Sequence, residues 1–170
     1  MELLIVIIVI AILAAITIAS YNGITMRVYN VAVQGDLANI ARQIEVYRAE
    51  NDTYPRNVAF QMLGPKVSKS AYGALWFDNE HMPRNLLYCS PIATPDRYLL
   101  IARSKSGAVF TYGTDGSDES DMSITDGSTS TSICSQFDIP TAGTVEDRQI
   151  FYEPKLDGSS PEDGWNSWVR

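Results

Sequence analysis

Residues 3–19 read Leu-Leu-Ile-Val-Ile-Ile-Val-Ile-Ala-Ile-Leu-Ala-Ala-Ile-Thr-Ile-Ala and hold no charged side chain; the acid Glu2 directly precedes them. Spanning a bilayer takes about 20 mostly apolar helical residues, and the run from Leu3 to Ile24 has about that length. It is longer than the apolar core of a secretion signal and lacks a small-residue cleavage site. Residues 3–16 also have no polar face, unlike a core helix of a soluble domain. The sequence therefore predicts a helix for a membrane or for the centre of a filament.

An amphipathic pattern continues this helix to about residue 50. Polar side chains, among them Arg27, Asp36 and Glu45, predict a face in contact with water. The turn formers before Pro55 end the helix. A continuous helix from Glu2 to Glu50 would measure about 70 Å. Apolar residues recur mostly at steps of three or four and predict a core-facing stripe of Ile24, Val28, Val31, Leu37, Ile40, Ala41, Ile44 and Tyr47.

The remaining residues predict a small head built on β-strands. Residues 52–84 show no clean period and read as a long packed connection. Short β-type runs follow at 85–89, 97–103 and 108–112, and a later one at 149–153, with a turn at Lys105-Ser106-Gly107. Both faces of the hairpin at 97–112 carry apolar groups, so one of them is expected to meet the helix stripe. Trp165 and Trp168 are expected to pack on the sheet rather than to form a binding platform.

Charge and cysteine content narrow the function classes. The net charge is −7 and the acids concentrate after residue 110, which argues against a nucleic-acid-binding surface. Cys89 and Cys134 lie 45 positions apart with no C-x-x-C or histidine partner, so a zinc site is not expected. If the head lies outside the cytoplasm, a disulfide between them is the default interpretation. Two separate buried thiols are the alternative.

Residues 114–132 are almost entirely Ser, Thr, Asp, Gly and Glu. Carboxylates on a Gly-rich turn can bind Ca²⁺, which takes six to eight oxygen ligands, and Asp115, Asp118 and Asp121 are the candidate ligands. The EF-hand pattern fails, because Ser120 stands where that loop needs glycine. A solvated, mobile loop is the commoner meaning of this composition and is the favoured interpretation. No other cofactor is expected.

No catalytic motif is apparent in this chain. His81, the one histidine, has no neighbouring acid or cysteine pattern and is interpreted as a surface residue. Nucleophile-elbow, P-loop, dinucleotide-binding and zinc-protease motifs are all lacking. The sequence therefore favours a protein that is not an enzyme.

The first 55 residues resemble the type IV pilins and their relatives, the pseudopilins of type II secretion. The resemblance rests on Glu-Leu-Leu-Ile-Val-Ile-Ile-Val-Ile-Ala-Ile-Leu-Ala-Ala-Ile at 2–16, on Tyr21, on the amphipathic continuation and on the ending Glu50-Asn-Asp-Thr-Tyr-Pro55. It implies an α+β pilin fold, in which one long N-terminal helix packs its C-terminal half on an antiparallel sheet of three to five strands. The expected regions are an apolar helix at 1–23, its amphipathic continuation at 24–51 and a globular head at 52–170.

The resemblance also implies a structural role. Such proteins wait in the inner membrane, are trimmed by a prepilin peptidase and are built by an assembly machinery into a helical filament of identical subunits at the cell surface. Glu2 falls where the family has the acid thought to pair with the terminal amine of a neighbouring subunit. The residues expected to take part in assembly are Glu2, Leu3, Leu4, Ile5, Ile8, Ile12, Tyr21 and Gly23.

Two departures from the family pattern affect these expectations. Only Met1 precedes Glu2, where the family has a leader and a few further residues, so leader processing is not predicted from this sequence. Ala19 stands near the end of the apolar run where the family often has a proline, which leaves Gly23, with Asn22, as the expected point of melting or bending. A pseudopilin of a secretion system and a membrane-anchored binding module that never polymerises remain the alternatives.

Overall fold

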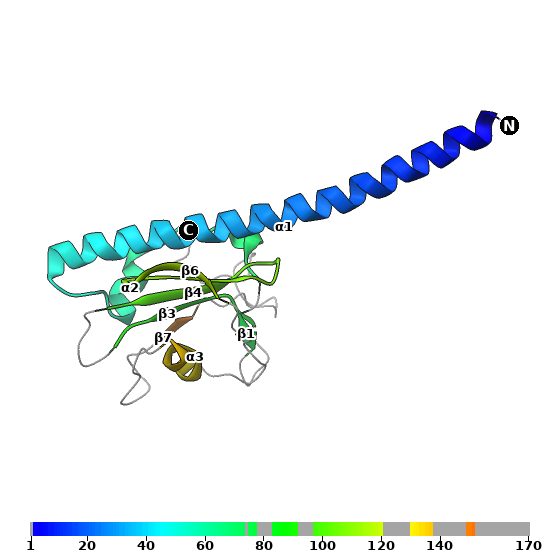
Figure 1. Ribbon diagram of the computed structural model, residues 1–170. Coiled ribbons are helices and arrows are strands. Elements are labelled where there is room, and N and C mark those ends of the chain that lie inside the picture. Colours follow the sequence, from blue (N-terminus) through cyan, green and yellow to red (C-terminus); the bar gives the residue numbers. More distant parts are fainter. Residues whose placement is uncertain are drawn as a thin grey trace, which may run out of the picture.

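A single long helix dominates the computed structural model, which describes residues 2–73, 75–77, 83–91, 97–120, 130–137 and 149–151. Helix α1 spans Glu2–Asn51, and its N-terminal half projects away from a compact head (Figure 1). It ends where the Asn51 side chain donates to the Tyr47 carbonyl and Asp52 adopts a positive φ of 56°. Asn22 and Gly23 do not interrupt α1; it curves gently and does not melt at the expected point.

The connection after α1 carries short regular elements, which the sequence did not predict. Helix α2 spans Asn57–Leu63, and a single 3-10 turn, η1, spans Lys69–Ala71. Strands β1 (Trp76–Phe77) and β2 (Pro83–Arg84) form a separate antiparallel pair. Elements this short lack the repeated periodicity by which helices and strands are recognised.

A five-stranded antiparallel sheet, in the order β6-β5-β4-β3-β7, forms the head. Its strands are β3 (Leu86–Cys89), β4 (Leu99–Arg103), β5 (Val109–Gly113), β6 (Gly116–Ser120) and β7 (Gln149–Phe151). Strands β3, β4, β5 and β7 confirm the four predicted runs, and the predicted turn at residues 105–107 joins β4 to β5. The predicted α+β class, a long helix on an antiparallel sheet, is therefore confirmed.

The alternating residues of β4 divide the core into two clusters. Tyr98, just before the strand, and Leu100 and Ala102 face α1, whereas Ile101 faces the opposite side, where helix α3 (Ser130–Gln136) contributes Ile133. This is the period-two alternation of a strand buried on both faces. The sheet therefore lies between α1 and α3 (Figure 1). An apolar cluster fills the space on each of its two faces.

Only part of the predicted helix stripe faces the head. Leu37, Ile40, Ala41 and Ile44 are buried in the core, together with Val33, which the predicted stripe omitted. The prediction was wrong for Ile24, Val28 and Val31, which are 63%, 58% and 68% exposed. At 3.6 residues per turn these three side chains lie on the side of α1 nearly opposite to Val33 and Ile40. They form a second apolar line that the head does not cover.

Candidate assembly surface

The N-terminal half of α1 presents apolar side chains in every direction. The large apolar side chains from Leu4 to Ile16 are each 49–64% exposed, although all belong to one regular helix. This half is long and apolar enough to cross a membrane, and none of its most hydrophobic stretch is buried within the protein. An apolar surface of this extent needs an apolar environment, either lipid or other apolar chains.

The structure places the predicted assembly residues along this helix. The side chains of Leu4, Ile5, Ile8, Ile12 and Tyr21 are exposed. Gly23 is also open to solvent, because a Cβ built there would meet nothing within 4 Å. Glu2 and Leu3 belong to the first turn of α1, but their side chains lie outside the described parts of the protein.

The polar groups of this helix are satisfied locally. The Thr17 hydroxyl donates to the Leu13 carbonyl at 2.8 Å, and the Thr25 hydroxyl donates to the Tyr21 carbonyl at 2.9 Å. Each hydroxyl therefore needs no partner from outside the helix, which is the usual solution for threonine in an apolar medium. Both threonines are compatible with burial among lipids or neighbouring helices.

Asp36 fastens the middle of α1 to the connection that follows α2. The Ser68 backbone N–H donates to one Asp36 carboxylate oxygen at 2.6 Å, and the Ser68 hydroxyl donates to the other at 3.3 Å. Burial raises the pKa of Asp36, and the hydrogen bonds from Ser68 offset only part of this effect. The prediction that Asp36 lies on the solvated face was wrong, because Asp36 is only 8% exposed.

A second set of contacts holds α1 where it leaves the head. The Ser106 hydroxyl, in the β4–β5 turn, donates to the Asn30 side-chain oxygen. In the same turn Lys105 places its Nζ 5.8 Å from the centre of the Tyr29 ring, within the range of a cation–π contact. These contacts lie in the first part of the amphipathic half, close to where α1 leaves the head, so they help to fix the direction in which the apolar half projects.

Aromatic side chains fix the C-terminal end of α1. Arg48 donates to the Tyr54 hydroxyl at 2.7 Å, and that hydroxyl donates to Glu45 at 3.2 Å. The Tyr54 ring packs on the Tyr98 ring, with centroids 4.9 Å apart. Tyr88 donates from its hydroxyl to the Pro55 carbonyl, and burial raises the pKa of Tyr88 above its usual range. The tyrosines are therefore neutral structural groups that fasten α1 to the sheet.

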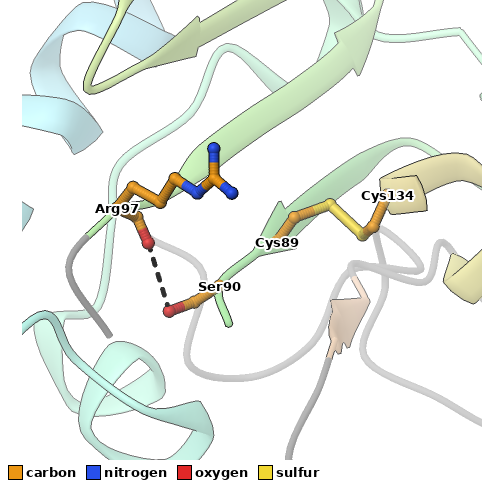
Figure 2. Close-up of a disulfide and its surroundings, with 4 residues drawn as sticks. All are labelled: Cys89, Ser90, Arg97 and Cys134. Atoms are coloured by element: carbon orange, nitrogen blue, oxygen red, sulfur yellow. Dashed lines mark hydrogen bonds between the residues drawn. A yellow bond between two sulfur atoms is a disulfide. The ribbon is translucent and has the colours of Figure 1, made fainter. Parts of the chain in front are cut away.

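The disulfide joins Cys89 at the end of β3 to Cys134 in α3, with Cα atoms 5.8 Å apart (Figure 2). Both cysteines are completely buried, and no described cysteine is free. Beside it, the Ser90 hydroxyl donates to the Arg97 carbonyl at the limiting distance of 3.5 Å, as Figure 2 also shows. The bond holds α3 against the face of the sheet that points away from α1. It therefore stabilises the fold of the head and lies far from the apolar half of α1.

The predicted acidic loop is partly regular structure. Residues 116–120 pair with β5 as strand β6, and residues 130–132 begin helix α3, so the mobile-loop interpretation was wrong for these parts of the segment. Backbone pairing with β5 outweighs the weak strand preference of Ser, Asp and Gly. Asp115 and Asp118 are exposed on this hairpin, Asp121 lies outside the described residues, and the described residues contain no group of three potential metal ligands.

Among the described residues, the candidate functional surface is the exposed apolar half of α1. His81, Trp165 and Trp168 lie outside them, as do residues 152 and 153 of the last predicted strand. No protein-family model, curated protein or solved structure matches the chain. The function is therefore inferred from this surface and from the sequence that forms it.

Proposed function

We propose that this protein is the structural subunit of an extracellular type IV pilus filament. It polymerises through the apolar half of α1. The observation that carries the proposal is the projection of that half from the head with its described side chains exposed on every side. A membrane anchor alone needs a similar length of apolar helix, but the resemblance at residues 2–16 is to helices that pack together in filaments. The subunit has no catalytic role, and adhesion, motility or DNA uptake would be properties of the fibre.

In the membrane, lipid covers the apolar half of α1; in the filament, other copies of the same helix cover it. Exchanging lipid for helix contacts changes the hydrophobic free energy little, because both surroundings are apolar. Assembly therefore needs an external energy source, which the assembly machinery of the inner membrane would supply. The head remains in the aqueous phase throughout, which is consistent with its net negative charge and its disulfide.

Glu2 gives this assembly a defined register. An unpaired carboxylate in an apolar environment costs several kcal/mol or takes up a proton. A neighbouring subunit that brings its cationic N-terminus to Glu2 removes this cost, so one axial position of the two helices is favoured over the others.

Replacing Glu2 by alanine tests this role. We expect Glu2→Ala to leave the protein in the membrane fraction and to abolish surface filaments seen by electron microscopy. Glu119→Ala, which removes an exposed carboxylate from β6, is the matched control and should leave filament number unchanged. Normal filaments in the Glu2→Ala strain would refute the pairing role.

Two rival functions make different predictions. A pseudopilin would build a short periplasmic structure for protein export, so deletion of the gene would stop secretion without removing long surface fibres. A membrane-anchored binding module would remain monomeric in detergent, and its deletion would remove no fibre. Imaging of cells with and without the gene separates the pilus subunit from both rivals, and measuring secretion in the same cells separates the two rivals from each other.

A further inference from the structure

An exposed apolar line extends the candidate assembly surface onto the head region of α1. Ile24, Val28 and Val31, here called the outer stripe, are more than half exposed and lie on the side of the helix nearly opposite to the core. They follow the apolar half directly but stand beyond the predicted apolar segment at 1–23. Three neighbouring β-branched side chains at the spacing of one helix face are typical of a helix contact.

A groove near the C-terminal end of α1 has properties that complement those of the outer stripe. It lies between the C-terminal part of α1 and the end of α2, has a volume of about 300 Å³, and is lined by Arg42, Gln43, Val46, Tyr47, Glu50 and Leu63. Val46, which lies on the wall of this groove, is 58% exposed. Its apolar residues suit isoleucine and valine side chains, and Glu50 can meet Arg27, the one charged residue between 24 and 31.

We infer that the outer stripe of one subunit packs into this groove on the next copy of the same chain. This inference rests on the proposed function. It names a contact between neighbouring subunits that lies outside the packed apolar halves of α1. The two helices must be parallel, because the apolar halves of both copies have to lie in the same apolar layer.

The geometry of this contact explains why it would propagate. The centre of the stripe lies about 18 residues before the centre of the groove, so successive copies are shifted by about 27 Å along the helix axis. Stripe and groove also point in directions about 70° apart around that axis at 3.6 residues per turn, so successive copies are rotated. A contact between two different surfaces that combines rotation with an axial shift cannot close into a ring and gives an open helical polymer.

A second groove on the other flank of α1 fits the stripe less well. It has a volume of about 360 Å³ and lies between the helix and the β5–β6 hairpin, where Ser117, Asp118 and Glu119 form its rim. Burying valine and isoleucine against this rim would remove two carboxylates from water without supplying a cation to each. This groove serves as the internal control for the position of the contact.

Cross-linking of cysteine variants tests the inference in the full-length chain. The native cysteines are paired in the disulfide and will not react. We expect the double variant Val28→Cys with Val46→Cys, treated in intact cells with a short bifunctional thiol reagent, to give a ladder of covalent oligomers. Each single variant should remain monomeric, because stripe and groove are different surfaces. Cells making the two single variants together should give dimers and no ladder.

The control pair is Val28→Cys with Ser117→Cys, which should give no ladder. A ladder from this pair, or dimers from either single variant, would overturn the assigned contact. Filaments that form normally while the Val28→Cys, Val46→Cys pair stays monomeric would also overturn it but would leave the proposed function standing. A chain that forms neither filaments nor oligomers would overturn both.

Reversing the charges gives a second, independent readout. Arg27→Glu or Glu50→Arg alone should lower the cross-linked fraction severalfold, because each places like charges side by side, and the two reversals together should restore it. Equal yields in all three variants would contradict the Arg27–Glu50 pairing and with it the proposed alignment of stripe and groove.

Discussion

At the scale of single residues, Asp36 shows how context changes the meaning of a side chain. In the sequence it is one of several polar residues on an amphipathic helix. In the structure it is buried and accepts two hydrogen bonds from Ser68 across 32 residues of chain. Its charge is costly in that position, and its hydrogen bonds offset part of the cost. The residue therefore joins α1 to the head and makes that junction sensitive to pH.

The raised pKa of Asp36 predicts a pH effect on stability. The folded protein holds this proton more tightly than the unfolded chain, whose pKa is near the ordinary 3.8. The contribution of Asp36 to the free energy of unfolding is therefore greatest below pH 3.8 and is lost as pH rises through the folded pKa. We expect Asp36→Asn to remove this dependence when denaturant unfolding in detergent is compared with wild type between pH 3 and 7.

Asp52→Asn is the matched control, since Asp52 is exposed and its positive φ is well tolerated by asparagine. This variant should follow the wild-type pH profile. An Asp36→Asn profile parallel to that of the wild type would contradict the assignment.

At the scale of elements, the disulfide fastens the short helix α3 to strand β3. Helix α3 has only seven residues and would be marginal in isolation. Ile133 and Cys134 pack against the sheet face that also carries Leu87 and Ile101. The bond closes a sequence separation of 45 residues, for which the chain-entropy account gives about 3–4 kcal/mol. The covalent link thus compensates for a helix too short to persist by itself.

Replacing both cysteines with serine should therefore lower the free energy of unfolding by about 3–4 kcal/mol. We expect the amide hydrogens of α3 to lose more protection from exchange than those of β4 and β5, which keep their ladder of backbone bonds. Reduction of the wild-type protein should reproduce the effect. Uniform loss of protection across the head would show instead that the bond stabilises the whole sheet equally.

At the scale of the whole molecule, two regions have opposite requirements. The head has an apolar core on both faces of its sheet, whereas the apolar half of α1 has no polar face and projects from the head. Because the two regions are separated along one helix, one end can occupy an apolar environment while the other remains in water. The fold of the head should accordingly be independent of changes in the projecting half.

A charge within that half tests this independence. Ile10→Arg places a cation near the middle of the apolar segment, at a cost of about 2.5–3.5 kcal/mol for membrane insertion. We expect a lower fraction of the protein in membranes, measured by sedimentation, and an unchanged melting temperature of the head in detergent. Ile10→Leu is the control and should match the wild type. A fall in the melting temperature would show that the two regions are coupled.

The sequence by itself determined the features that depend on local pattern. The uncharged apolar run predicts a helix that needs an apolar environment, and the run at 97–103 predicts a strand with apolar groups on both faces. A chain with two cysteines allows a single disulfide within itself. The tertiary structure decided which side of α1 meets the head, why Ile24, Val28 and Val31 remain uncovered, and that Asp36 is buried. It also paired the acidic residues 116–120 as a strand, because that pairing depends on β5 rather than on their own composition. These outcomes arise from contacts between residues distant in sequence, which a periodic pattern along one segment does not encode.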